Sequence, residues 1–377
     1  MSVKILVAGD FCPQQRVKDL FEEGKFQVVL GNVKPFVDCA DFSIVNFECP
    51  VTKGGEKKIK KCGPNLQCDE KGMEAISWAG FCCVTLANNH FRDYGDDGVR
   101  NTLAACEGYH LDRVGGGKNI EEASRTLYKE IKGEKVAIVN CCEHEFSIAT
   151  ETTGGSNPLN PIRQYYAIKD AREKADYVLV IVHGGHEHYQ LPSPRMQETY
   201  RFFIDSGADA VVNHHQHCYS GYEEYHGRPI FYGLGNFCFD KEDKRNGVWN
   251  KGYLVQLEFG EREVKYDIIP YVQCDDQASV QLCDKADEMK VIDRLNGIIA
   301  NGKQLAEAYG GFVNDNGEPY LLALEPYTGH FGGLRKKRLV PSLLNSKYFL
   351  RLYGYLLCES HYQRLLELLR NKVYGKD

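Results

Sequence analysis

The sequence predicts an α/β fold, and two patterns along the chain support that prediction. Short runs rich in β-branched and aromatic residues recur, and most are bounded by Gly, Asp or Asn. Polar–apolar stretches with helical spacing lie between several of these runs. Because strands and helices that alternate along a chain pack as sheets covered by helices, we expect an α/β core. The expected strands are residues 3–8, 42–46, 81–86, 136–140, 177–182, 210–213 and 230–232.

Helices and one hairpin complete the expected core. Residues 253–259 and 264–269 alternate with a period of two on either side of a short polar turn, which is typical of a β-hairpin. We expect this hairpin to close the sheet system. The helices are expected over residues 98–108, 121–128, 168–175 and 195–206.

The pattern changes after Tyr271, and we therefore expect a domain over residues 1–274 and a mostly helical C-terminal extension over 275–377. Residues 284–305 and 347–372 look helical and are separated by a Gly-rich stretch. The last helix is apolar on one side and follows a short basic run, so it could lie on a membrane surface. We favour packing on the core as a lid, or on another subunit in a homo-oligomer.

Composition narrows the class of protein. The chain has 377 residues, with 46 basic and 52 acidic side chains, so it lacks the strongly basic footprint of a nucleic-acid binder. No run of about 18 apolar residues predicts a transmembrane helix, and the apolar run at the N-terminus is too short for a signal sequence. We expect a cytoplasmic protein whose fifteen scattered cysteines are reduced.

Seven of the twelve histidines lie between His183 and His226, most of them in two clusters. The first cluster contains His183, His186 and His188, the second runs from His214 to His217, and each follows an expected strand. Neutral imidazole is a good ligand for Zn, Fe and Mn ions. The two clusters therefore indicate a metal site.

Other polar side chains also follow expected strands, where functional groups of α/β proteins collect. Each has a plain alternative: Asp10 could cap a helix, Glu48 could be solvated, Asn89 could form a turn, and His90 could be a core or surface histidine. Taken with the histidine clusters, they provide two carboxylates, an amide oxygen and several imidazoles. This mixture suits one or two divalent ions, Mn, Fe or Zn, which would activate water for hydrolysis.

Ordered motifs lie between residue 3 and about residue 270, at residues 7–10, 46–50, 86–95, 114–119, 183–187, 213–217 and 231–240. On these motifs the chain resembles the bacterial poly-gamma-glutamate capsule-synthesis (CapA-like) proteins of the calcineurin-like metallophosphoesterase superfamily. The resemblance implies a four-layer αββα sandwich with the metal ions at one sheet edge.

The resemblance also implies a role for each matching residue. His90 would be a catalytic histidine that binds no metal and stabilises the transition state or protonates the leaving group, and Asp93 would orient it. On their residue types alone, any of His186, Glu187 and His188 could add a ligand or contact the substrate, and Glu187 is the one that the family pattern retains. The metal ligands implied are Asp10 and His217 for one ion, Asn89, His183 and His215 for the other, and Glu48 as the bridge between them.

The sequence departs from the expected pattern at several positions. Cys12 stands where the wider superfamily has a histidine ligand, so the first ion would bind weakly. Gly184, Asn213 and Gln216 replace an aromatic residue, a glycine and a proline of the family, which leaves the ligands intact but alters the pocket. Asn236 and Asp240 are expected to shape the pocket floor, His214 to be structural and His226 to lie in a loop, and the lysine-rich residues 57–61 are expected to form a solvated loop.

Three functions remain open on these grounds. A metal-dependent phosphoesterase is favoured, and it would act on an anionic small molecule or polymer. The alternatives are an accessory protein that binds a capsule polymer without cleaving it and a hydrolase of gamma-glutamyl amide bonds. The sequence does not identify the substrate, because a fold-level likeness does not fix it.

Overall fold

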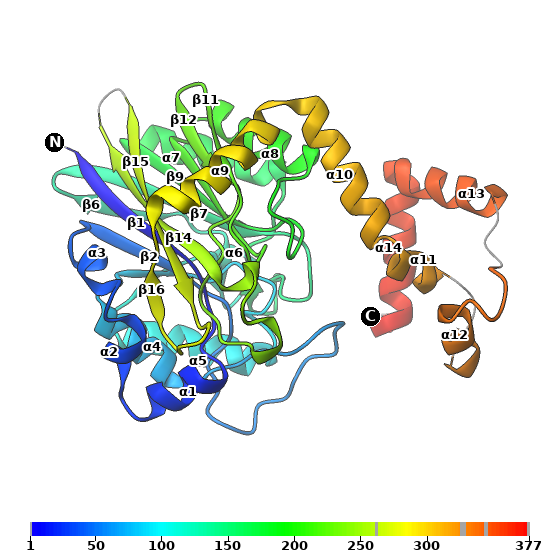
Figure 1. The fold of residues 1–377 in the computed structure, drawn as a ribbon, viewed down its shortest axis with the longest axis horizontal. Coiled ribbons are helices and arrows are strands. Elements are labelled where there is room, and N and C mark those ends of the chain that lie inside the picture. Colours follow the sequence, from blue (N-terminus) through cyan, green and yellow to red (C-terminus); the bar gives the residue numbers. More distant parts are fainter. Residues whose placement is uncertain (1, 261–262, 325–328, 343–345, 375–377) are drawn as a thin grey trace. The chain divides into compact units, whose positions relative to one another are not determined.

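The computed structural model describes residues 2–260, 263–324, 329–342 and 346–374, which form two compact units, Met1–Tyr309 and Gly310–Asp377. The first unit contains two large β-sheets with helices on their outer faces (Figure 1). This arrangement is an α/β four-layer sandwich, and the fold class predicted from the sequence is confirmed.

The larger sheet is built around its first strand, which pairs in parallel with β2 and with the short β13, and antiparallel with β14. The predicted hairpin is confirmed as β14 and β15, which lengthen this sheet on one side. In spatial order the strands are β16 (Val280–Leu282), β15 (Val264–Gln273), β14 (Lys251–Phe259), β1 (Val3–Phe11), β2 (Phe42–Phe47), β3 (Cys83–Thr85) and β4 (Asp112–Val114), with β13 (Asn236–Cys238) beside β1.

The smaller sheet is parallel at its centre and has an antiparallel strand at each edge. Its central strands are buried along their whole length, as expected for parallel strands covered on both faces. In spatial order the strands of this sheet are β11 (Tyr222–Tyr225), β12 (Arg228–Phe231), β10 (Ala210–His214), β9 (Tyr177–His183), β7 (Glu134–Cys142) and β6 (Leu127–Ile131). A separate two-stranded sheet joins β5 (Gly116–Gly117) to β8 (Gly155–Ser156).

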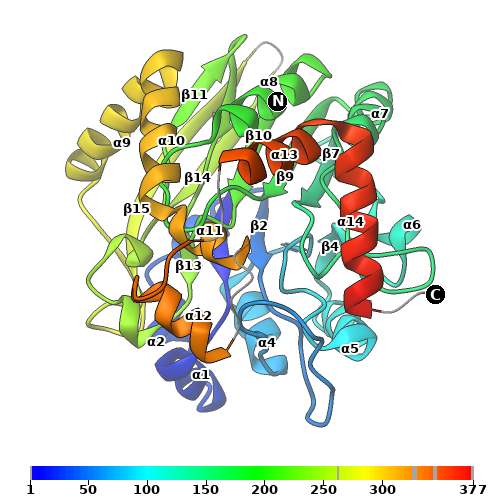
Figure 2. The same cartoon turned by 90° about the vertical axis from the view of Figure 1, so that its right-hand side faces the viewer.

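Two hydrophobic clusters hold the layers together. Alternate residues of β1 belong to different clusters: Leu6 packs with the helices that cover the larger sheet, whereas Ile5 and Val7 pack toward the smaller sheet. Both views show these helices and those of the smaller sheet on opposite sides of the unit (Figures 1 and 2). The first set is α1 (Gln15–Glu22), α2 (Phe26–Leu30), α3 (Lys34–Asp38), α4 (Glu70–Ala79) and α5 (Gly95–Gly108), and the second is α7 (Pro161–Lys174), α8 (Pro194–Asp205) and α9 (Lys285–Ala300).

Three sequence-based expectations for single elements were wrong. Residues 284–305 are not one helix, because the helix breaks at Asn301, between α9 and the helix that begins at Gly302. Residues 121–128 are not one helix, because α6 (Ile120–Ala123) ends early and Leu127 already begins β6, which pairs with β7. The expected last helix is two helices, α13 (Ser346–Leu357) and α14 (Glu359–Tyr374), which follow α11 (Glu318–Leu324) and α12 (Gly329–Lys336) in the second unit. Strand pairing and the break at Cys358 leave no signal in hydrophobic periodicity.

Residues 275–309, placed in the C-terminal extension by the sequence, lie within the first compact unit. Strand β16 extends the larger sheet by pairing with β15, and α9 buries Ile292 and Ile299 in the core of the unit. Helix α10 (Gly302–Asn316) begins in this unit and ends in the other. Whether an independently folding domain ends near residue 274 stays a prediction.

None of the helices in the described residues has the length and hydropathy needed to cross a bilayer.

The contact between β1 and the loop before β13 predicts a sensitive position at Gly9. A Cβ atom placed on Gly9 would lie 1.9 Å from the carbonyl oxygen of Gly235, which also accepts a hydrogen bond from the N–H of Asp10. We expect Gly9→Ala to lower the free energy of unfolding by about 1–3 kcal/mol, because the strands must separate. Chemical denaturation would measure this loss, with Gly108→Ala, where the added atom meets nothing within 4 Å, as the control. Equal stabilities of the two variants would contradict the close approach.

Candidate metal centre

The ends of strands from both sheets bring the predicted ligands together. Two groups of side chains have their ligand atoms within 4.8 Å of one another: Glu48 with His183 and His215, and Asp10 with Glu48 and His217. All five are buried. Because Glu48 belongs to both groups, the structure has the arrangement expected of a carboxylate that bridges two ions.

Glu48 provides the strongest evidence that a cation fits this site. Both of its carboxylate oxygens are fully buried, and no group within the described residues donates a hydrogen bond to either. Burial, together with the nearby charge of Asp10, raises the pKa of Glu48 well above its usual range. A buried carboxylate without a partner is costly, whereas a divalent ion would satisfy both oxygens. The donor set of oxygen and nitrogen atoms is compatible with divalent metal binding.

Asp10 is held in place by a group from β2 and a group from the loop after β10. The side-chain N–H of Asn46 donates to Oδ1 at 2.7 Å, and the backbone N–H of His215 donates to Oδ2 at 3.2 Å. Burial raises the pKa of Asp10 to about 7, although these two hydrogen bonds act in the opposite direction. The side-chain nitrogen of Asn46 also lies 3.2 Å from Nδ1 of His183, so Asn46 orients one member of each group.

The group of Glu48, His183 and His215 lies beside the predicted amide ligand, Asn89. Oδ1 of Asn89 lies 3.0 Å from Nε2 of His183, and Nδ1 of His215 lies 3.1 Å from the same nitrogen. Nε2 of His183 is also 3.6 Å from Oε1 of Glu48. Burial lowers the pKa of His183 well below its usual range, so the imidazole stays neutral and able to bind a metal.

The group of Asp10, Glu48 and His217 has fewer candidate ligands around it. His217 places Nδ1 3.7 Å from Oδ2 of Asp10 and 2.9 Å from Oδ1 of Asn236, and its ring lies against Trp249 with the centroids 4.7 Å apart. Cys12, two residues after Asp10, is buried but belongs to neither group of candidate ligands among the described residues. With Asn89 beside the other group, the described residues place one candidate ligand fewer around His217 than around His183.

The loop after β10 holds its histidines in an unusual backbone conformation. His215 and His217 have φ values of 85° and 55°, in the left-handed region that non-glycine residues rarely adopt. Such residues cost about 1–3 kcal/mol each and cluster at functional sites. The surrounding structure therefore compensates for strain that brings two imidazoles to the same centre.

His90 and Asp93 form a buried pair beside the metal ligands. Nδ1 of His90 lies 2.6 Å from Oδ2 of Asp93, as expected if Asp93 orients the ring. The ammonium of Lys61 lies 2.5 Å from Oδ1 of Asp93 and 3.1 Å from Nδ1 of His90, and its side chain is only 2% exposed. The sequence placed Lys61 in a solvated loop, and for this residue the expectation was wrong, because its charge is buried against Asp93.

Two of the predicted residues lie outside both ligand groups. His186 is partly buried, and its Nε2 lies 3.2 Å from the hydroxyl of Tyr309, whereas Glu187 is exposed. Neither residue is therefore among the candidate ligands that the described chain brings together.

The residues expected to support the site do lie around it. His214 is buried with Nδ1 3.4 Å from Oδ1 of Asp10, yet neither ring nitrogen makes a hydrogen bond within the described chain. Burial lowers the pKa of His214 to about 3, so its ring is neutral. Asp240 is buried and pairs with Arg16 at 2.8 Å and with Arg245 at 3.1 Å, so its charge is compensated by two guanidinium groups.

The departures from the family pattern have local explanations. A Cβ atom on Gly184 would lie 2.8 Å from Cγ of Glu143, so an aromatic side chain would displace Glu143. Asn213 donates from its amide to the carbonyl oxygens of Gly184, His214 and Tyr232. Gln216 donates to the carbonyl oxygens of Tyr189 and Leu191 and thereby ties the two histidine-bearing loops together.

Sequence reasoning missed the part that four residues play at the site. Asn46 and Asn236 orient ligands, Lys61 pairs with Asp93, and Glu145 accepts a hydrogen bond from Asn89 at 3.3 Å. Glu145 follows the end of β7, so the strand-end rule that found Glu48 could also have found it. Lys61 carries no such signal, because one lysine of a basic run looks like the others.

A two-sheet α/β sandwich with a buried carboxylate–imidazole cluster at the strand ends defines a protein with a candidate site for divalent metal ions. Within that class, the chain belongs to the family described as bacterial capsule synthesis protein PGA_cap, whose model matches residues 4–241. The resemblance stated from the sequence is therefore confirmed.

Two curated relatives carry names from capsule synthesis. The chain is 34% identical over 243 residues to the capsule biosynthesis protein CapA of Bacillus anthracis, covering 62% of this chain and 59% of that protein. It is 31% identical over 236 residues to the PGA biosynthesis protein CapA of Bacillus subtilis (strain 168), covering 62% of each. The chain thus spans about three-fifths of the length of these relatives.

The solved structures that the chain resembles are more distant in sequence. A phosphatase of Mycoplasma pneumoniae is 16% identical, with a TM-score of 0.46 over 73% of this chain and 95% of that chain. A 5'-nucleotidase precursor of Thermus thermophilus is 11% identical, with a TM-score of 0.45 over 86% of this chain and 60% of that chain.

The buried ion pair predicts that Lys61 is needed for stability. Lys61→Met would leave the charge of Asp93 buried without its cation, which typically costs about 3–5 kcal/mol. We expect a corresponding fall in the free energy of unfolding, measured by denaturant titration, whereas Lys57→Met at an exposed position of the same run should change little. Equal denaturation midpoints would show that Lys61 does not hold Asp93 in solution.

The raised pKa values of the carboxylates predict how ion binding depends on pH. In the ion-free protein, the pKa of Asp10 is about 7 and that of Glu48 is well above its usual range, so both hold protons in mild acid. A bound cation requires the charged forms, so binding must release protons. We expect the affinity for Mn²⁺ to rise as the pH increases from mildly acidic to mildly alkaline. Calorimetry in two buffers with different ionisation enthalpies would count the protons, and a pH-independent affinity would contradict this prediction.

Proposed function

We propose that the protein is a metal-dependent hydrolase that acts on a phosphoester. The observation that supports this proposal is the buried carboxylate of Glu48, which has no hydrogen-bond partner in the described residues and is shared by two groups of candidate ligands. When bound, divalent ions supply Lewis acidity and lower the pKa of a water molecule. The ligands would be Asp10, Glu48 and His217 for one ion and Glu48, Asn89, His183 and His215 for the other.

The chain's own acid or transition-state stabiliser would be His90. Its Nδ1 is engaged with Asp93, so Nε2 is the nitrogen available to a substrate. Burial lowers the pKa of His90, while the contact with Asp93 acts in the opposite direction and favours the protonated ring. His90 would thus donate a hydrogen bond or a proton to an oxygen that gains charge in the transition state.

The smaller ligand set of the first ion favours a second candidate function. Without the superfamily's histidine at Cys12, that ion would be held weakly, and a single ion could bind a polyanion without cleaving it. The protein would then be an accessory factor in making or exporting a capsule polymer, which is the context named for its Bacillus relatives. Cleavage of a gamma-glutamyl amide is a further use of the same centre, because an activated water molecule can also attack a carbonyl carbon.

The proposal also includes a substrate class, an oligomeric state and a cellular location. An anionic small molecule or polymer would be the substrate, since cations at the centre attract negative charge. A homo-oligomer through the C-terminal helices and a cytoplasmic location stay predictions.

The role given to His90 predicts a separation of activity from ion binding. We expect the wild-type protein with Mn²⁺ or Zn²⁺ to hydrolyse an aryl phosphate or phosphodiester, and His90→Ala to lower kcat by about 10²–10⁴. Ion content, measured by elemental analysis, should be unchanged in that variant because His90 is not a ligand. His226→Ala, in an exposed loop, is the control. Unchanged turnover in His90→Ala would remove this mechanism, and polymer binding without turnover of any ester would favour the accessory function.

A further inference from the structure

The protein also contains a pocket of about 420 Å³ whose lining includes none of the candidate metal ligands. One wall comes from the segments that follow β7 and β9. The backbone N–H of Glu143 donates to the carbonyl oxygen of His183 at 3.0 Å, and the N–H of Gly185 donates to Oε2 of Glu143 at 3.3 Å. This wall therefore begins at the end of the strand that carries the candidate ligand His183.

The opposite wall is the first turn of α8. Ser193 caps this helix by accepting the N–H of Met196 at 3.2 Å, so the positive end of the helix dipole faces the pocket. Arg195 also lines the pocket and is exposed. Its guanidinium has no hydrogen-bond or ion-pair partner among the residues that the structure describes. This side of the pocket therefore carries uncompensated positive charge.

The third side comes from α10. The hydroxyl of Tyr309 lies 3.2 Å from Nε2 of His186, and the two ring centroids are 5.5 Å apart. Leu159 and Met196 add apolar surface to the lining. The pocket thus combines an apolar wall with one acidic and one basic side chain, Glu143 and Arg195, that do not pair with each other within the described chain.

We propose that this pocket binds a zwitterionic amino-acid unit, with its ammonium group at Glu143 and its carboxylate at Arg195. A ligand that carries both charges would neutralise Glu143 and Arg195, which line the same pocket but do not pair with each other within the described chain. The planar fork of an arginine matches a carboxylate, and a volume of about 420 Å³ lies in the range typical of small-molecule sites. That this unit is one end of the substrate rests on the proposed hydrolase function, but its binding does not.

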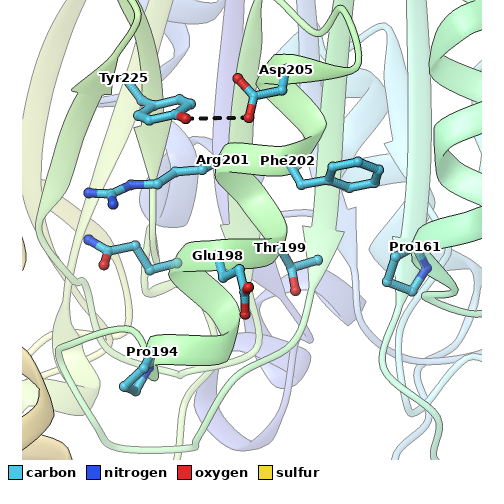
Figure 3. Close-up of a pocket in the computed structure, with 9 residues that line it drawn as sticks. Pro161, Pro194, Glu198, Thr199, Arg201, Phe202, Asp205 and Tyr225 are labelled. Atoms are coloured by element: carbon cyan, nitrogen blue, oxygen red, sulfur yellow. Dashed lines mark hydrogen bonds between the residues drawn. The ribbon is translucent and has the colours of Figure 1, made fainter. Parts of the chain in front are cut away.

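A groove on the outer side of α8 provides a comparison (Figure 3). There Arg201 pairs with Glu223 at 2.6 Å, and Asp205 accepts a hydrogen bond from the hydroxyl of Tyr225 at 3.3 Å. Glu198 lies on the same helix as Arg195. It lines this groove but not the pocket that contains Glu143 and Arg195. It is therefore a matched position for a control variant.

Calorimetry of the full chain after chelator treatment would test the proposal without any turnover. The probes are L-leucine, L-lysine and L-glutamate, each compared with its N-acetyl form, which lacks the ammonium group, and its α-amide, which lacks the carboxylate. We expect at least one free amino acid to bind and each modification to weaken it by about tenfold or more, the usual effect of losing a charged hydrogen bond.

Two variants assign each charge to its partner. In Glu143→Gln, N-acetylation of the amino acid should no longer weaken its binding. In Arg195→Gln, amidation of the amino acid should no longer weaken its binding. Glu198→Gln should bind all forms as the wild type does. No binding of any free amino acid, equal affinity for the free and modified forms, or the same loss in Glu198→Gln would overturn the proposal. Binding by a protein that hydrolyses no ester would support the pocket and reject the hydrolase, so the two failures are distinguishable.

Discussion

The buried carboxylate of Glu48 is the constraint on which the site depends. It is removed from water and receives no hydrogen bond from the described chain, so the folded protein must either protonate it or place a cation beside it. The surrounding histidines are themselves buried, and burial lowers the pKa values of His183 and His217 well below their usual range. Neutral imidazoles do not compensate the charge of a carboxylate but are the form that binds metal. Burial thus prepares both kinds of ligand for an ion.

The scaffold maintains this arrangement through rigid backbone contacts. β1 approaches the loop before β13 so closely that Gly9 has no room for a side chain, and the next residue is the ligand Asp10. On the other sheet, the register places His183 beside His214, and the chain then turns through left-handed backbone at His215 and His217. Since such backbone is costly, the loop depends on its contacts, including the hydrogen bonds made by Gln216.

Three residues around the candidate ligands differ from the pattern expected from the sequence. Cys12 lies two residues after Asp10 but joins neither group of candidate ligands among the described residues. Lys61 adds a buried cation to the pair of His90 and Asp93. Gly184 leaves room for Glu143, which then lines the neighbouring pocket. These differences lie around the ligands, where the identity of a substrate is decided.

The sequence by itself determined the fold class, the hairpin and the set of candidate ligands. Strands buried on both faces and helices with one apolar face produce periodic patterns, and polar residues at strand ends interrupt those patterns visibly. Only the tertiary structure decided which of these side chains lie within reach of one another, that β6 is a strand, and that the side chain of Lys61 is buried while its neighbours are exposed. These features depend on contacts between segments far apart in the chain. Local periodicity is set by burial of one face and therefore contains no information about which distant group lies opposite.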